Sequence, residues 1–245
     1  MRIPFILYVL KVPLYDMVVA NLLISLGTSG FNFALRAQVG LLPSHVLLLS
    51  AAMIAGSLVG AFLGASITHR VSERRLKAFI ASILSLVVAR LVVDFVVGIS
   101  SSKTVFPIYA ESPLAAAFGF LIGIIAGSIG VAGGEYRIPV LIFIFGLPIK
   151  VAGTVSQLVS LPTIIVALLK HRNMGFLSRR SLALAGLMGI PSVLGVVVSL
   201  RLLLAFGEEG IRLVFALILL YTIVRLLFEL KGGKIRVATM HPQGF

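Results

Sequence analysis

The chain has 245 residues, of which 59% are hydrophobic and 12% are charged, and its mean hydropathy is +1.14. Soluble domains carry about twice that share of charged residues, and a chain of this length cannot hide so much apolar surface in one core. The composition therefore excludes an ordinary cytosolic enzyme and a disordered chain. Because there is no cysteine, a disulfide scaffold, a thiolate metal site and a cysteine nucleophile are excluded as well.

The net charge of +13 comes from 21 Lys and Arg residues against 8 Asp and Glu residues. The basic residues stand in short clusters between apolar runs, as the positive-inside rule expects. No basic stripe interleaved with aromatic residues is present. We therefore expect the partner of this chain to be the lipid bilayer and not nucleic acid.

Continuous apolar runs predict helices that cross a membrane, and not the alternating segments of an outer-membrane barrel. Seven runs have the length of a span; in chain order they are 15–35, 46–67, 76–99, 114–131, 151–169, 182–204 and 211–230. Two further runs, 3–10 and 138–145, are too short to cross alone and predict half-helices or re-entrant segments. The sequence thus predicts an all-α, multi-pass protein of the cell membrane.

An internal repeat appears when the chain is shifted against itself by 135 residues without a gap. Arg2, Ile3, Pro4 and Pro13 recur as Arg137, Ile138, Pro139 and Pro148, Ser25 as Ser160, Gly60 as Gly195 and Glu73 as Glu208. Apolar residues match by chance in such chains, but polar residues and prolines in one register do not. We expect a first repeat at 1–98, a linker loop at 99–113, a second repeat at 114–231 and a basic tail at 232–245.

The charges of the loops indicate how the two repeats are oriented. In the first repeat the loop 36–45 carries one arginine and the loop 70–77 is strongly basic. In the second repeat the order reverses, because the loop 170–180 is basic and the loop 207–210 is acidic. If basic loops face the cytoplasm, corresponding loops lie on opposite sides. The pattern predicts inverted-topology repeats, which are typical of secondary carriers with a site near the midplane.

The first repeat begins within a motif. Met1 aligns with Tyr136, so nothing in the first repeat corresponds to the hairpin at 114–135. We expect the coding sequence to continue upstream with a similar glycine-rich hairpin. The alternative is a protein that works with one asymmetric half.

A family resemblance covers nearly the whole chain. Residues 123–148 read GIIAGSIGVAGGEYRIPVLIFIFGLP, which resembles the signature of the sulfite exporter TauE/SafE family, here without its N-terminal hairpin. The family's following Gly-Thr-Ser stretch is similar to residues 152–156, although Ala132 replaces one glycine of the glycine-rich turn. The resemblance implies a membrane transporter for a small, often sulfur-containing anion, with no cofactor.

Two arginines adjoin the short runs and are candidates for binding that anion. Arg137 and Arg2 would lie at membrane depth, where a charged side chain is costly and usually functional. The planar donor fork of arginine suits sulfonate or carboxylate oxygens. The alternative is a structural role, in which each arginine reaches an interface or Arg137 pairs with Glu135. Glu135 could instead carry a coupling proton.

The remaining candidate residues are small or polar. The short helix is expected to begin near Arg137. Glycines in the turn before it would let backbone amides approach an anion, although a tight turn needs the same glycines. Hydroxyls and amides on the next helix could bind substrate or bond across helices. These candidates are Gly130, Gly133, Gly134, Thr154, Ser156 and Gln157, together with Asn21, which is the counterpart of Ser156. The four-residue spacing of Gly56, Gly60 and Gly64 and of Gly119, Gly123 and Gly127 predicts close helix packing.

The function predicted from these features is secondary transport of a small anion, such as sulfite or a sulfonate, by alternating access. A channel or the membrane subunit of a larger complex is the alternative, and a homo-oligomer is compatible with either. An intramembrane enzyme would need a paired catalytic set, which Asp16 and Asp94 do not provide, so we do not expect an enzyme. The histidines at 45, 69, 171 and 241 lack the spacing of metal ligands and are expected in solvated loops or the tail.

Overall fold

The computed structural model describes residues 14–67 and 108–207, together with positions 210, 211, 214, 217, 218, 220 and 221. Every element in these ranges is a helix. In chain order the elements are α2 (Leu14–Gln38), the short 3-10 helix η1 (Ser44–Val46), α3 (Leu47–Ile67), α5 (Ile108–Ile129), α6 (Gly134–Phe143), α7 (Ile149–Asn173) and α8 (Arg179–Ala205). The runs expected at 3–10 and 76–99, most of the run at 211–230, and Arg2 lie outside the described residues.

Within the described part of the chain, five helices are long and apolar enough to cross a membrane. These segments are Asp16–Gln38, Ser44–Ser66, Glu111–Ser128, Ile149–Asn173 and Arg179–Ala205. The predicted all-helical, multi-pass class is confirmed. By contrast, α6 has only ten residues, which span about 15 Å, or roughly half of a bilayer's hydrocarbon core. It is therefore a half-helix, as expected from the short run at 138–145.

The start of α6 differs from the sequence expectation, which placed it near Arg137. The helix begins at Gly134, directly after Gly133, whose φ of 74° lies in the left-handed region. The carbonyl of Gly133 accepts hydrogen bonds from the amides of Tyr136 (3.3 Å) and Arg137 (3.1 Å). Because glycine adopts this conformation without steric cost, the turn closes tightly and α6 starts three residues earlier.

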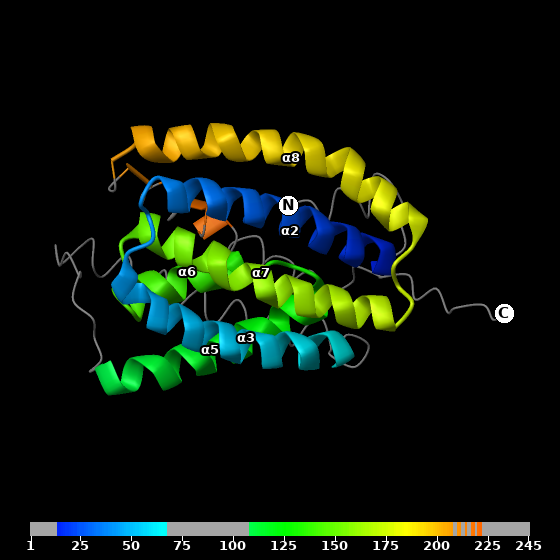
Figure 1. Cartoon of the computed structure of the whole chain (residues 1–245), viewed down its shortest axis with the longest axis horizontal. Coiled ribbons are helices and arrows are strands. Elements are labelled where there is room, and N and C mark those ends of the chain that lie inside the picture. Colours follow the sequence, from blue (N-terminus) through cyan, green and yellow to red (C-terminus); the bar gives the residue numbers. More distant parts are fainter. Residues whose placement is uncertain are drawn as a thin grey trace.

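Helices α2 and α7 lie side by side and run in opposite directions (Figure 1). Arg36, near the end of α2, donates to the carbonyl of Lys150, near the start of α7. Both helices have 25 residues, and their bounds differ by the 135 residues of the repeat. The opposite directions of these corresponding helices agree with an inverted repeat, which itself stays a prediction.

Helix α8 runs in the same direction as α2 and packs mainly against it (Figure 1). At the start of both helices the Ser178 hydroxyl donates a hydrogen bond to the Asp16 carboxylate. Ser178 is also the N-cap of α8 and forms a capping box with Ser181, which explains why the helix begins at Arg179. The α8 span is far less buried than the other four.

Helices α3 and α5 form the closest helix pair, joined through their glycines. A Cβ atom built on Gly60 would lie within 3.0 Å of the Phe120 carbonyl and the Ile124 nitrogen. The Ser57 hydroxyl donates across the pair to the Gly119 carbonyl at 3.1 Å. The close helix packing predicted from the four-residue glycine spacing is therefore confirmed, because the glycines let the two backbones come into contact.

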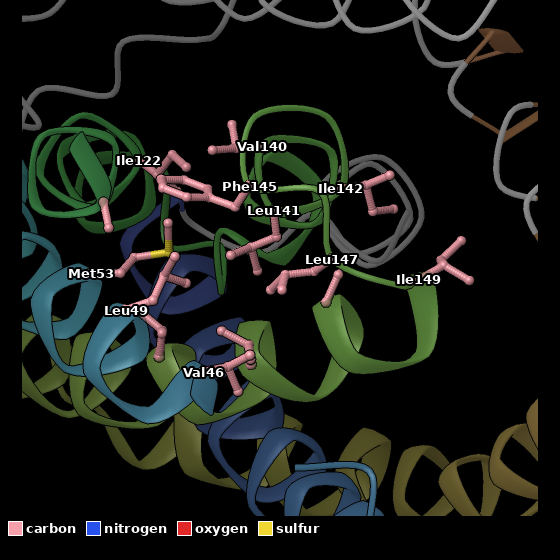
Figure 2. Packing of buried hydrophobic residues seen from close by; sticks show 14 residues of the cluster. Val46, Leu49, Met53, Ile122, Val140, Leu141, Ile142, Phe145, Leu147 and Ile149 are labelled. Carbon is pink, nitrogen blue, oxygen red and sulfur yellow. The ribbon is translucent and has the colours of Figure 1, made fainter. Parts of the chain in front are cut away.

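The main core cluster holds α6 in place (Figure 2). Leu141 of α6 and Phe145 of the following loop are buried among Met53 of α3 and Ile122 of α5. This packing fixes the position of a helix that is too short to cross the membrane by itself. Its N-terminal turn, where the candidate residues gather, is thereby set at one position beside α7.

Candidate functional site

Arg137 lies on α6 and faces the middle of α7. Its side chain is fully buried, with 0% exposure. The Nη1 group donates to the carbonyl of Ser156 at 3.0 Å and to the hydroxyl of Ser160 at 2.7 Å. One nitrogen of the guanidinium is thus anchored to α7, which fixes the orientation of the planar group.

The other two nitrogens of this guanidinium have no partner among the described residues. Within the described part of the chain, neither Nε nor Nη2 of Arg137 has a hydrogen bond, and the hydroxyl of Ser156 has none either. A Cβ atom on Gly133 would lie 3.4 Å from Nη2, and one on Gly134 would lie 3.4 Å from the Ser156 oxygen. The unpartnered polar atoms therefore converge on the glycine turn at the start of α6.

The backbone of this turn also presents donors. The amides of Gly133 and Gly134 form no hydrogen bond with another described residue. They stand at the N-terminus of α6, where the helix dipole favours a negative charge. A Cβ atom on Gly133 would also lie 3.1 Å from Ile122 and 3.3 Å from Ala126, so this turn packs closely against α5. Together with the guanidinium, these amides form a site that offers donors and positive charge.

Two side chains from neighbouring helices hold the turn in shape. Asn21 of α2 donates from Nδ2 to the Gly130 carbonyl at 2.7 Å. The Ser160 hydroxyl lies 3.0 Å from the Ala132 carbonyl. Gly130 packs so tightly against Val18 that any side chain there would collide with it. Asn21 and Gly130 thus position the turn and bind each other.

A polar cavity of about 300 Å³ lies next to the turn, between α2, α7 and α8. Ala132 of the turn and Gln157 of α7 form one part of its wall. The two other helices line the rest with Ser25, Thr28, Ser29 and Asn32 of α2 and with Ser192, Gly195, Val196 and Ser199 of α8. A cavity lined by so many hydroxyls and amides is unusual between membrane-spanning helices, where unpaired polar groups are costly.

Comparison with known proteins decides the family. The sequence model of the family described as "Sulfite exporter TauE/SafE" matches residues 1–91 and 115–244, which is most of the chain. The chain belongs to the TauE/SafE family. No curated protein and no solved structure matches it. Because this is a transporter family and the chain has several apolar spans, the protein is a multi-pass membrane transporter.

The structure brings together some of the site residues predicted for this TauE/SafE protein and separates others. Gly133, Gly134, Arg137 and Ser156 meet at one place, as described above. Thr154 does not join them, because its hydroxyl donates to the Lys150 carbonyl of its own helix at 3.0 Å. Arg2 and the side chain of Glu135 are outside the part of the chain that the structure describes, so their roles stay predictions.

Sequence reasoning missed several polar residues of the site. Ser160 contacts Arg137, and its position four residues after Ser156 places both on one face of α7. Ser25, Ser29 and Asn32 follow one another at helical spacing on α2 in the same way. This periodicity of small polar residues inside an apolar run was the signal that could have found them.

One sequence expectation about histidine is wrong. His171 does not lie in a solvated loop; it is buried in the last turn of α7, and its Nε2 lies 3.3 Å from the Gly127 carbonyl. The apolar run ended at 169, but the helix continues to Asn173 and carries the ring inward. Among the described residues no group of His, Asp and Glu side chains could hold a metal ion.

Proposed function

We propose that this TauE/SafE protein is a secondary transporter that moves a small oxyanion of the sulfite or sulfonate type by alternating access, and that Arg137 binds the anion. The observation that carries this proposal is the buried guanidinium at the glycine turn, two of whose nitrogens have no partner among the described residues. Arg2, Thr154 and Gln157 are further proposed contacts, and Glu135 is proposed either to pair with Arg137 or to carry a coupling proton.

The energetic reason lies in the cost of burying a charge. A guanidinium taken out of water without a counter-charge loses several kcal/mol of solvation. No salt bridge joins Arg137 to a described side chain, so the two hydrogen bonds to α7 offset only part of that loss. An anion that enters the turn would supply both the charge and the missing acceptors.

The arrangement of donors suits an oxyanion with several oxygens. A guanidinium edge binds two oxygens of a planar or pyramidal anion in parallel hydrogen bonds. The amides of Gly133 and Gly134 and the Ser156 hydroxyl are left for a further oxygen. Sulfite has three oxygens around one sulfur, and the description of the family as sulfite exporters agrees with this chemistry.

Alternating access is supported by the position of the site. Arg137 binds residues near the middle of α7, and the corresponding helices α2 and α7 run in opposite directions past it. A midplane site between inverted repeats can be opened to either side by rocking one repeat against the other.

Transport is tested with the purified chain in two sets of liposomes, one loaded with buffer alone and one with buffer and unlabelled sulfite. We expect uptake of ³⁵S-labelled sulfite that saturates with concentration and is accelerated by unlabelled sulfite on the other side, because a carrier exchanges its substrate. Flux that rises without saturation would favour a channel. The purified chain could also be inactive and regain flux when it is reconstituted together with other proteins of its native membrane. That result would favour a subunit of a larger complex.

The orientation of the helices gives a separate prediction. Because the loop 170–180 is basic, we expect it in the cytoplasm and the loop between α2 and α3 outside. Single substitutions Asn173→Cys and Ser44→Cys provide the test, since the native chain has no cysteine. A membrane-impermeant maleimide added to intact cells should label position 44 and leave position 173 unlabelled. Labelling of position 173 alone would reverse the orientation, and labelling of both would contradict the fold.

A further inference from the structure

The polar cavity between α2, α7 and α8 offers hydrogen-bond donors while some of its acceptors are already used. Oδ1 of Asn32 accepts a hydrogen bond of 2.8 Å from Nε of Arg36, which leaves the Nδ2 donors of that amide for the cavity. The Ala132 carbonyl lies within reach of the Ser160 hydroxyl. The hydroxyls of Ser25 and Ser29 have no hydrogen bond to another described residue. The lining therefore favours a ligand rich in acceptors.

Arg36 stands one turn beyond Asn32 on α2 and is itself nearly buried, with 8% exposure. Its Nη1 lies 3.5 Å from the Lys150 carbonyl and close to Gly153, where an added Cβ atom would lie 2.6 Å from Nη1. No described carboxylate pairs with it. At one end of the cavity, Asn32 is hydrogen-bonded to Arg36. At the other end, Ala132 lies near the Ser160 hydroxyl, which accepts a hydrogen bond from Arg137.

We propose that this cavity is a second binding station for the transported oxyanion, in which neutral hydroxyl and amide donors hold the anion and Arg36 positions Asn32 and supplies positive potential. The inference rests on the proposed function, since one anion would occupy both stations. The cavity has the volume of a small ligand pocket, with room for an oxyanion and several waters. It extends about 10 Å along α2, from Ser25 to Asn32.

A binding site whose lining carries no charge would bind the anion more weakly than Arg137 does. Hydrogen bonds from neutral donors are weaker than those from a guanidinium. An anion held only by Arg137 would leave slowly, whereas a weaker neighbouring station lets it depart in steps. Thr28 and Ser192 contribute shape but no donor, because each hydroxyl donates to its own helix.

The first test measures sulfite uptake in proteoliposomes for the double variant Ser25→Ala with Ser29→Ala. We expect the KM for sulfite to rise about tenfold while the maximal rate and the amount of protein stay within about twofold, because two neutral donors are lost without a change in charge. Arg36→Gln should also raise KM, and Arg36→Lys should raise it less. The matched control is Ser50→Ala on α3, a buried serine whose hydroxyl donates to the Val46 carbonyl, and its KM should equal that of the unmodified chain.

The second test does not depend on transport. Ser29→Cys gives a single thiol in the cavity, and methanesulfonate, which does not react with thiols, is the probe anion. We expect it to slow modification of position 29 by a small thiol reagent, and we expect Arg36→Gln to raise the half-protecting concentration about tenfold. Sodium gluconate, which supplies the same cation with a larger anion, should not protect.

The outcomes separate this inference from the proposed function. An unchanged KM in the double serine variant, or no protection at position 29, would overturn the second station even if the unmodified chain transports sulfite. Equal protection by sodium gluconate would overturn it too, because the effect would then come from the cation. If the chain transports no anion, the proposed function fails, and protection at position 29 still reports whether the cavity binds an oxyanion.

Discussion

Replacing Gly60 by alanine should push α3 away from α5 and lower the melting temperature of the detergent-solubilised protein by about 4–8 °C. The added Cβ would lie within 3.0 Å of backbone atoms of Phe120 and Ile124, which cannot rotate aside. Overpacking of this kind costs about 3 kcal/mol, and the better helix propensity of alanine returns up to about 1 kcal/mol. For a chain of this size each kcal/mol corresponds to roughly 2–4 °C.

The repeat supplies a matched control for this change. Gly195 stands at the position of α8 that corresponds to Gly60, yet a Cβ atom built there meets nothing within 4 Å. Gly195→Ala should therefore leave the melting temperature unchanged or raise it slightly. Equal melting temperatures for the two variants would show that the contact between α3 and α5 is looser than the structure has it.

Much of the helical framework could be predicted because spans are set by hydropathy and length. The run at 151–169 predicted α7, but the helix extends from Ile149 to Asn173, since its ends are set by Pro148 and by the basic last turn and not by apolar residues. The partner of each helix could not be predicted. Four-residue glycine spacing shows that α3 and α5 each have a small-residue face, whereas their pairing depends on the whole fold.

The candidate residues that belong to one sequence motif could be predicted. Those that come together only through the packing of two helix faces could not. Arg137 and the glycine turn stand together in the sequence, so their meeting is local. Ser160 lies 23 residues further on, and only the packing of α6 against α7 brings its hydroxyl to the guanidinium. Thr154 stands two residues before Ser156, but its hydroxyl donates to the carbonyl four residues earlier, as threonine inside a helix easily does, and its contact with the substrate stays a prediction.

Arg137→Gln should abolish sulfite flux while the protein still reaches the membrane. Glutamine keeps a hydrogen-bond donor for α7 but removes the charge and the two free nitrogens that face the glycine turn. Arg137→Lys keeps the charge and loses the fork, so we expect the affinity for sulfite to fall roughly ten- to hundredfold, which corresponds to about 1.5–3 kcal/mol for one charge-assisted hydrogen bond. Initial uptake rates over a range of sulfite concentrations, normalised to the protein in the liposomes, provide the measurement.

A control and a double variant separate anion binding from a structural role of Arg137. Arg201→Gln removes an exposed arginine near the end of α8 and should leave KM unchanged, because this side chain lines neither the glycine turn nor the polar cavity. If Arg137 only neutralised Glu135, the double variant Arg137→Gln with Glu135→Gln would restore the flux that either single change removes. We expect no restoration, since the guanidinium that binds the anion is still missing, and recovery of flux in the double variant would contradict the proposed binding site.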